Sequence, residues 1–301
     1  MNEMIRNLLK DTFRDNVVFN VSAKDFTTFK TGGILSAVVF PSDKTHIELL
    51  FELWQKGIPV KFVGCGSNLL ISDEGFDGII AVTKKFSGID YTKDNISVCC
   101  GTKISSLIKF CIDKNIAGFE FLAGIPGTIG GALVNNAGTK EKSISQVVLN
   151  VEYIDKKGFW QKEKKNNFVW EYRYSSLKNE AFFIFSTSLI TEKGAAGEIK
   201  KKVSQIMKKR IQTQPLQYPS AGSVFKNPPG FFAGKLIQDA GLKGLKIGGA
   251  MVSEKHANFI VNIKNASSTD VWNLIRHIQQ TIRNRYNISL DLEIETVGRF
   301  E

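Results

Sequence analysis

Strand and helix signals alternate along the first third of the chain, and no other feature of the sequence constrains the fold as strongly. Runs of β-branched and other apolar residues predict strands over residues 34–40, 58–64, 78–82 and 96–100. Apolar residues at helical spacing predict helices between these strands, over residues 43–57 and 103–115. Such alternation is typical of α/β and α+β architectures.

The remaining two thirds predict a hairpin, two long helices and two further strands. The hairpin covers residues 147–164, with its turn at "DKKG", and a strand follows over 182–190. A lysine-rich helix over 197–215 ends at Pro215, and its lysines are expected to be solvated. A Ser- or Thr-capped helix over 268–287 precedes a final strand over 288–297.

Composition narrows the classes of binding partner but does not identify one. The 301 residues are 43% hydrophobic, enough for two or three packed units, and carry a formal net charge of +11. This balance favours anionic partners, among them nucleic acid, phospholipid headgroups and phosphorylated small molecules. The N-terminus does not read as a signal peptide, and no apolar run approaches the roughly 20 residues that span a bilayer, so we expect a soluble, cytoplasmic protein. Four cysteines without C-x-x-C spacing make zinc and disulfides improbable.

Two glycine-rich segments look suited to close approach of a phosphate. In "VGCGSNLLISDEG", residues 63–75, a strand runs into glycines whose N–H groups, with the Ser67 and Asn68 side chains, face an anion. In "LAGIPGTIGGALVNNAG", residues 122–138, five glycines would weaken an ordinary helix or strand. Neither segment is a P-loop or a G-x-G-x-x-G fingerprint. The residues alone leave two readings open, one extended phosphate-bearing ligand or two unrelated turns; Cys65 reads as a small loop residue.

A third segment, "YPSAGSVFKNP" at residues 218–228, is ambiguous when taken alone. Ser223, Lys226 and Asn227 have groups that bind anions, but Pro, Ser, Ala and Gly together are also what a solvated loop contains. The loop is the better interpretation until other parts of the chain are considered.

Eight segments, taken in order, resemble the family of UDP-N-acetylenolpyruvoylglucosamine reductases, the MurB family. The resemblance runs from about residue 20 to the C-terminus and is specific as a combination, although no single segment is. The chain looks like the compact type of that family, which lacks an inserted substrate-clamping loop. The segments are "TTFKTGG" (27–33), "GCGSN" (64–68), "LAGIPGTIGGALVNNAG" (122–138), "YRYSSLK" (172–178), "YPSAGSVFKNP" (218–228), "GKLIQDAGLKG" (234–244), "KHANFIVN" (255–262) and "LEIE" (292–295).

The resemblance implies an α+β fold, with an FAD-binding domain of the vanillyl-alcohol-oxidase-like (PCMH) type followed by an α+β substrate-binding domain. We expect an N-terminal FAD-binding part over 1–82, a second FAD-binding subdomain over 83–200 and a substrate-binding domain over 201–301. It also implies non-covalent FAD, NADPH as hydride donor, and reduction of UDP-N-acetylglucosamine enolpyruvate to UDP-N-acetylmuramate in peptidoglycan synthesis. The cofactor would be held by Gly64, Cys65, Gly66, Ser67, Asn68, Gly124, Ile125, Pro126, Gly127, Thr128, Gly130, Gly131, Ala132, Asn136 and Gly138.

The chemistry of that reaction assigns roles to a few residues by resemblance. Hydride reaches the β-carbon of the enolpyruvyl group, leaving charge on the carboxylate, and a proton must reach the α-carbon. Arg173 and Glu295 would bracket the carboxylate, and Ser223 would supply the proton. Tyr172, Lys226, Asn227 and His256 are expected to contact substrate.

One departure from the family weakens the choice of glutamate. A basic residue usually follows the C-terminal glutamate closely, but Thr296 and Val297 follow Glu295, and the next base is Arg299. Glu293 is the alternative to Glu295, and strand alternation places both on one face.

Two rival interpretations remain. A sugar or alcohol oxidase of the same fold commonly attaches its flavin to a histidine of the first glycine loop, and that loop has none. A nucleic-acid-binding protein fits the charge but lacks the interleaved aromatics of single-strand platforms. We expect a monomer that binds neither nucleic acid nor membranes.

Overall fold

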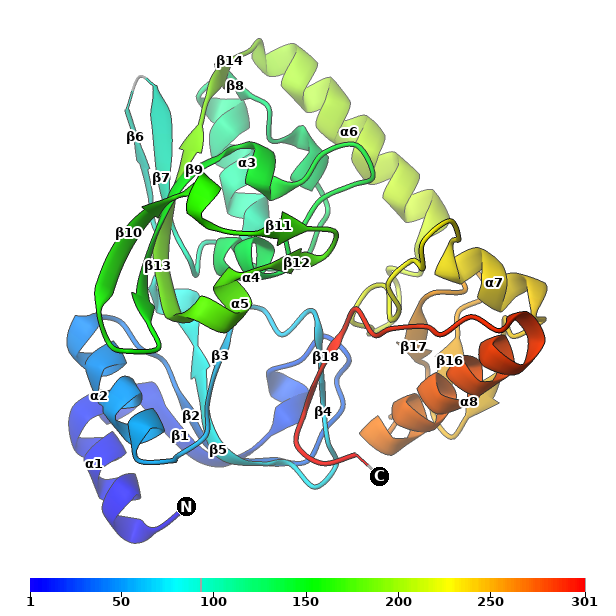
Figure 1. The fold of residues 1–301 in the computed structure, drawn as a ribbon, viewed down its shortest axis with the longest axis horizontal. Coiled ribbons are helices and arrows are strands. Elements are labelled where there is room, and N and C mark those ends of the chain that lie inside the picture. The colour runs from blue at the N-terminus through cyan, green and yellow to red at the C-terminus, as the bar shows by residue number, and fades with distance from the viewer. Residues whose placement is uncertain (93, 301) are drawn as a thin grey trace.

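Three β-sheets of three or more strands follow one another along the chain in the computed structural model, which describes residues 1–92 and 94–300 (Figure 1). The first sheet has the order β1-β2-β5-β3, with β2, β5 and β3 parallel and β1 antiparallel at the edge. Its strands are β1 (Val17–Ser22), β2 (Ile34–Val39), β3 (Val60–Val63) and β5 (Phe76–Val82), and its helices are α1 (Glu3–Phe13) and α2 (Lys44–Gln55). The helix α2 connects β2 to β3 and begins where Asp43 accepts a hydrogen bond from His46 N, at 3.0 Å.

The second sheet is antiparallel and has the order β10-β9-β13-β7-β6. Its strands are β6 (Ile89–Tyr91), β7 (Asn95–Cys99), β9 (Val148–Asp155), β10 (Trp160–Lys164) and β13 (Ala181–Ile190). Helices α3 (Ile104–Asp113), α4 (Ile129–Val134) and α5 (Leu177–Glu180) accompany it, with the short pairs β8 (Ile116–Ala117) with β14 (Glu192–Lys193) and β11 (Trp170–Glu171) with β12 (Tyr174–Ser175). One apolar core joins this unit to α1 and α2, and Phe62 of β3 packs edge-on against Phe182 of β13.

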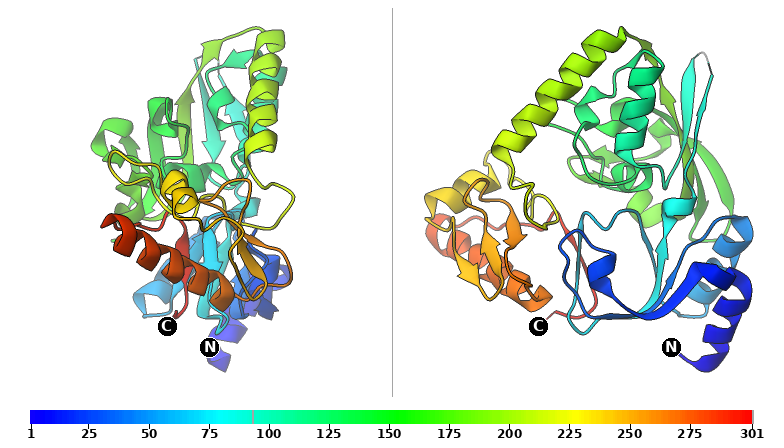
Figure 2. Two further views of the ribbon diagram at one scale, coloured as in Figure 1. Left: turned by 90° about the vertical axis from the view of Figure 1, so that its right-hand side faces the viewer. Right: turned by 180° about the vertical axis from the view of Figure 1, so that it is seen from behind.

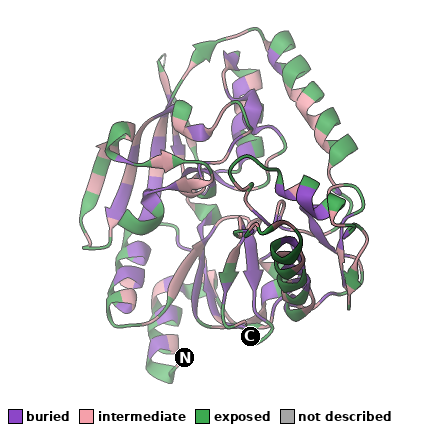
Figure 3. Cartoon of the chain, turned by 45° about the vertical axis from the view of Figure 1, so that its right-hand side comes forward, coloured by how far each residue is buried: buried purple, intermediate pink, exposed green. Residues whose placement is uncertain are grey.

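The third sheet is small and lies beyond the long helix α6 (Ala196–Thr213), as both views of Figure 2 show. It contains β15 (Lys246–Ile247), β16 (Ala250–Val252) and β17 (Ile260–Asn262), and it is accompanied by α7 (Ala233–Asp239) and α8 (Ser268–Tyr286). A separate apolar core holds this unit together, and α8 buries one stripe against it while its opposite face is exposed (Figure 3).

The end of the chain returns to the first unit. Strand β18 (Glu295–Val297) pairs in parallel with β4 (Leu69–Ile71), which directly follows the first glycine loop. Asp73, two residues beyond β4, accepts hydrogen bonds from the backbone N–H groups of Ser268 and Thr269 at the start of α8. The third unit is therefore attached to the first by a strand and by a helix N-terminus.

Most predicted elements are confirmed, with two corrections. The final strand predicted over 288–297 is wrong in length, because only Glu295–Val297 forms a strand, and the preceding residues make isolated contacts with the segment around Val224. The second glycine segment was not expected to be helical, yet Ile129–Val134 forms α4. Gly130 lets this helix approach β7, since a Cβ there would lie 3.0 Å from Cys100 Cβ. No helix within residues 1–92 and 94–300 is long and apolar enough to cross a membrane.

Candidate active site

A cavity of about 760 Å³ lies where the three units meet, within the range of small-molecule sites. Both glycine loops line it, together with the segment around Ser223 and the two C-terminal glutamates. Of the predicted cofactor-binding and catalytic residues, all but Asn136 are on its wall. The predicted residues, which come from segments far apart along the chain, therefore share one cavity.

The first glycine loop connects β3 to β4 and is packed tightly against its neighbours. Gly66 has a φ of +63°, and a Cβ there would lie 1.9 Å from Phe26 O, so no other residue fits. Cys65 is half-buried on the cavity wall, and burial raises the pKa of its thiol, although Lys103 partly opposes this. Its thiol is therefore largely protonated and unreactive at neutral pH, as expected for a small loop residue.

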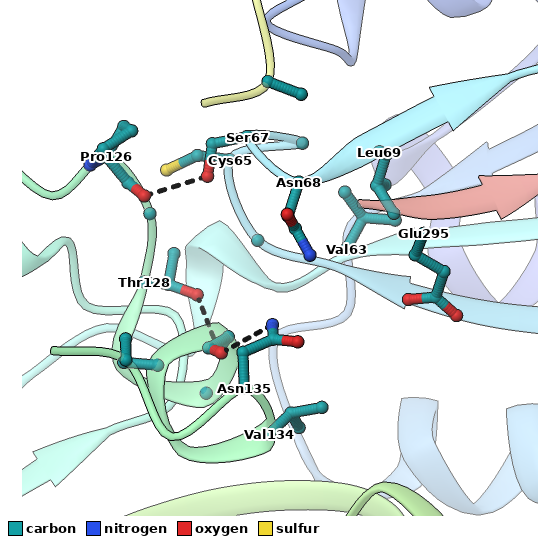
Figure 4. Close-up of a pocket in the computed structure, with 18 of the residues that line it drawn as sticks. Val63, Cys65, Ser67, Asn68, Leu69, Pro126, Thr128, Val134, Asn135 and Glu295 are labelled. Carbon is teal, nitrogen blue, oxygen red and sulfur yellow. Dashed lines mark hydrogen bonds between the residues drawn. The ribbon is translucent and has the colours of Figure 1, made fainter. Parts of the chain in front are cut away.

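The second glycine loop meets the first across the floor of the cavity (Figure 4). Ser67 Oγ donates a hydrogen bond to Pro126 O at 2.9 Å, and a Cβ on Gly64 would lie 2.3 Å from Thr128 Oγ1. Thr128 also caps α4, accepting a hydrogen bond from Gly131 N at 3.4 Å. The two loops thus form one continuous surface of backbone.

The space along this surface and the charge around it fit the expected pyrophosphate of FAD. A Cβ on Gly131 would have no protein atom nearer than 3.7 Å, and one on Gly127, whose φ is +140°, would project only toward Ser67 Oγ. The side chains missing here leave room for a ligand to lie against the backbone. The charges on the cavity wall agree, because five cationic side chains (Lys61, Lys156, Arg173, Lys178 and Arg210) face two carboxylates, those of Glu293 and Glu295.

Arg173 and Glu293 form an ion pair on the cavity wall. Arg173 Nε donates to Glu293 Oε1 at 2.7 Å, and the two side chains are 21% and 19% exposed. Arg173 also donates to Gly138 O at 3.1 Å and has a φ of +55°, a left-handed conformation that costs roughly 1 kcal/mol or more for a residue with a Cβ. Burial raises the pKa of the Glu293 carboxyl, an effect that Arg173 and Lys226 partly oppose.

Glu295 lines the same cavity but has a different partner. Its carboxylate accepts a hydrogen bond from Lys61 of β3, and both side chains are about one third exposed. Arg299, which could have replaced the expected base, is exposed and does not line the cavity. The prediction that strand alternation puts both glutamates on one face does not hold, because Glu293 lies in a bend before β18; only Glu293 meets Arg173.

The Ser223 hydroxyl is available for a ligand. Ser223 is half-buried on the cavity wall, and no side chain or backbone group of residues 1–92 and 94–300 hydrogen-bonds to its Oγ. An isolated β-bridge to Phe259 fixes the backbone of Ser223. The next residue, Val224, accepts a hydrogen bond at its backbone O from Glu293 N at 2.8 Å. The backbone of Val224, next to Ser223, is thereby tied to the backbone of Glu293.

The residues predicted to contact substrate lie outside this wall. Asn227 Nδ2 donates to Tyr172 Oη at 3.2 Å, and the Asn227 carbonyl oxygen caps α7 at Ala233 N. Lys226 is near enough to lower the pKa of Glu293, whereas His256 packs edge-on against Phe259, and burial lowers its pKa. Asn136 is buried and donates to Glu171 O at 2.9 Å, which is a structural contact.

Sequence reasoning missed several residues of the wall, and Arg210 is the most notable. The lysines beside it on α6 (Lys208 and Lys209) are exposed as predicted, but Arg210 faces the cavity and no carboxylate of the described residues contacts it. Its aliphatic part lies over Gly124, where a Cβ would be 2.7 Å from Arg210 Cδ. Burial lowers the pKa of its guanidinium, and Arg173 adds to the effect. No pattern in the sequence distinguishes Arg210 from the lysines beside it.

Two family models match the chain in the order of its units. Residues 35–162 match a model described as an FAD binding domain, and residues 214–297 match the C-terminal domain of UDP-N-acetylenolpyruvoylglucosamine reductase. These ranges contain both glycine loops and the segment with Ser223 and Glu293.

Full-length relatives and a solved structure agree with these models. The reductase of that name from Caldanaerobacter subterraneus subsp. tengcongensis is 38% identical over 300 residues, which cover 99% of each chain. That from Listeria welshimeri is 39% identical over 98% of this chain and 99% of its own. The crystal structure of UDP-N-acetylenolpyruvylglucosamine reductase (MurB) from Thermus caldophilus superposes with a TM-score of 0.81 at 31% identity, covering 92% of this chain and 98% of that one.

Proposed function

The chain belongs to the family of UDP-N-acetylenolpyruvoylglucosamine reductases, and we infer from this membership that it reduces UDP-N-acetylglucosamine enolpyruvate to UDP-N-acetylmuramate. It is an NADPH-dependent flavoenzyme that makes a precursor of peptidoglycan. The observation that carries this conclusion is the single cavity that joins the two glycine loops to Arg173, Ser223 and Glu293.

The cofactor is FAD, held without a covalent bond against the two glycine loops. When bound, FAD takes a hydride from NADPH and delivers a hydride to the β-carbon of the enolpyruvyl ether. The backbone of Gly127 and Gly131 leaves space for its pyrophosphate, and Arg210 supplies a cation that has no carboxylate partner among the described residues. Arg210 thereby joins the predicted cofactor-binding residues in this proposal.

Arg173 and Glu293 are proposed to hold the substrate carboxylate. Hydride addition at the β-carbon places negative charge on the carboxylate oxygens, and a guanidinium already fixed by an ion pair stabilises that charge without rearrangement. Glu293, whose pKa burial raises, is preferred over Glu295, because Glu295 is paired with Lys61. Glu293 therefore takes the role that the sequence-based prediction gave to Glu295.

Ser223 is proposed to donate the proton that completes the reduction. One proton added at the α-carbon and one hydride at the β-carbon balance the loss of the carbon–carbon double bond. The Ser223 hydroxyl has no hydrogen-bond partner among the described residues, and its neighbour Val224 is bonded to Glu293 through the backbone; both facts support this role. Lys226, Asn227 and Tyr172 are proposed to hold the nucleotide end of the substrate, since they lie beside Arg173 and Glu293 but outside the cavity wall.

Domain boundaries near residues 82 and 200, a monomeric state and a cytoplasmic location also remain proposals. The end of the first sheet at Val82 supports the first boundary, whereas residue 200 lies within α6, the helix that leads into the third unit.

An absorption spectrum tests the function. The purified protein is expected to be yellow, to release its flavin on acid precipitation, and to bleach when NADPH is added without oxygen. UDP-N-acetylglucosamine enolpyruvate should then restore the oxidised spectrum with one equivalent of UDP-N-acetylmuramate. Flavin that stays with the precipitate would favour the sugar or alcohol oxidase, and a colourless protein that does not bind added FAD would favour the nucleic-acid-binding rival.

A further inference from the structure

Asn68 contacts the C-terminal strand in a way that cofactor binding alone does not explain. Its side-chain Nδ2 donates to Glu293 O at 3.1 Å, and its backbone O accepts from Glu295 N at 2.9 Å. Asn68 therefore brackets Glu293 and Glu295 from the last residue of the first glycine loop. Figure 4 shows Asn68 and Glu295 on the same side of the cavity.

Glu293 is held on its other side by the segment that carries Ser223. Glu293 N donates to Val224 O at 2.8 Å, and Lys226 N donates to Asp291 O at 2.8 Å. The peptide of Glu293 thus has one hydrogen bond toward the serine and one toward the cofactor loop. Only the second of these depends on a side chain, that of Asn68.

We propose that Asn68 is a positioning residue, which fixes Glu293, and through it Ser223, in register with the first glycine loop. This inference rests on the proposed function and adds a second role to a residue otherwise assigned to the cofactor. The loop that seats the FAD and the segment that carries Glu293, just before β18, then move as one body. Seating of the cofactor and alignment of Glu293 and Ser223 become a single event.

The pKa of the Glu293 carboxyl reports on its position, because charged side chains surround it. Arg173 faces it from the turn between β11 and β12, and Lys226 faces it from the Ser223 segment. Glu295, two residues further along the chain, is neutralised by Lys61. If the Asn68 amide is removed, the Glu293 peptide loses its partner on the cofactor side. The carboxyl then becomes more hydrated, and its pKa falls toward the ordinary value of a glutamate.

The experiment compares Asn68→Ala with Asn262→Ala. Asn262 is a matched control, because its Nδ2 also donates to a backbone oxygen of the first unit, Phe29 O at 3.0 Å, away from the cavity wall. In Asn68→Ala, reoxidation of the flavin by substrate should slow at least about tenfold more than its reduction by NADPH, since small misplacement of reacting groups costs up to about a hundredfold. Asn262→Ala should reduce thermal stability without separating the two half-reactions.

A second readout does not depend on turnover. Carbon-13 NMR of labelled glutamates in the apoprotein, with the Glu293 signal assigned by Glu293→Gln, should show a lower Glu293 pKa in Asn68→Ala and no change in Asn262→Ala. Equal slowing of both half-reactions, a loss confined to the dissociation constant of FAD, or an unchanged Glu293 pKa would each overturn the positioning role. None of these outcomes touches the proposed function, which the wild-type half-reactions test. If Asn68→Ala does not fold, Asn68→Ser is used with the same expectations.

Discussion

At the scale of single residues, Ser223 separates the two halves of the reaction. Ser223→Ala should leave reduction of the flavin by NADPH nearly unchanged, because that step needs no proton from the serine. Reoxidation by the enolpyruvyl substrate should slow by roughly 10²–10⁴-fold, the usual contribution of a positioned general acid. Stopped-flow absorbance at the flavin band measures each half-reaction.

Ser220 provides the control for this experiment. It lies three residues earlier on the same cavity wall, but it is not beside the residue that bonds Glu293. Ser220→Ala should therefore not separate the half-reactions. A Ser223→Ala variant that reoxidises at the wild-type rate would return residues 218–228 to the interpretation as a solvated loop.

Substitution of each C-terminal glutamate in turn tests which of the two acts with Arg173. Glu293→Gln keeps the shape of the side chain but removes the charge that fixes Arg173, so kcat with the enolpyruvyl substrate should fall by about 10²-fold. Glu295→Gln leaves that pair intact and should cost about tenfold or less. Steady-state kinetics of both variants decide which glutamate acts with Arg173. A larger loss of kcat in Glu295→Gln than in Glu293→Gln would restore Glu295, the glutamate assigned from the sequence.

At the scale of elements, the contact between Asp73 and helix α8 should control how firmly the third unit is attached. Its carboxylate accepts bonds from Ser268 N at 2.9 Å and from Thr269 N and Oγ1, each at 2.8 Å. Asp73→Ala should lower the free energy of unfolding by about 1 kcal/mol, as for a lost helix cap. Denaturant melts measure the loss, and the exposed neighbour Glu74→Ala is the control.

The effect of Asp73 should depend on pH in one direction. Burial alone would raise the pKa of its carboxyl, but the hydrogen bonds from Ser268 and Thr269 outweigh this and lower it. A lowered pKa in the folded state means that the stabilisation is complete above the ordinary pKa of an aspartate and is lost as the pH falls below it. The difference between wild type and Asp73→Ala should therefore shrink in acid, and a difference that grows in acid would contradict this assignment.

Helix α6 contacts the second glycine loop at Gly124. We expect alanine to weaken cofactor binding at Gly124 and to stabilise the helix at Gly197, which lies within α6. Gly124 has a φ of +73° and lies under Arg210, so Gly124→Ala should displace the arginine and weaken FAD binding at least about tenfold. Gly197, near the start of α6, has open space around it, with nothing within 4 Å of where a Cβ would lie, and Gly197→Ala should stabilise the helix by up to about 1 kcal/mol. Flavin fluorescence titration measures the first effect, and equal affinities in both variants would rule it out.

At the scale of the whole molecule, the net charge of +11 should speed capture of anionic ligands. NADPH and the nucleotide-sugar substrate both carry phosphates, and exposed charges are screened beyond about 8 Å at physiological ionic strength. Second-order rates of capture should therefore fall as salt is raised, whereas the first-order flavin reduction after binding should not. Capture rates that stay flat with salt would exclude electrostatic steering while leaving the enzymatic function intact.

The sequence by itself determined the features that depend on neighbouring residues. Helical spacing located α2, α3 and α8, and the glycine content of residues 64–68 and 122–138 identified both loops on the cavity wall. These signals are local, because the periodicity of apolar residues and the freedom of glycine act within a few residues of the chain. The family resemblance, which the relatives confirm, supplied the chemistry that such local signals do not carry.

Only the tertiary structure decided which side chains meet. Glu293 and Glu295 are equivalent by strand alternation, and it is the approach of Arg173, 120 residues away, that distinguishes them. The direction of Arg210 depends on the space above Gly124. The start of the final strand depends on where its partner changes from the segment around Val224 to β4. Ion pairs and strand partners require segments that are distant in sequence to come together, and that proximity is set by the packing of the three units rather than by any local pattern.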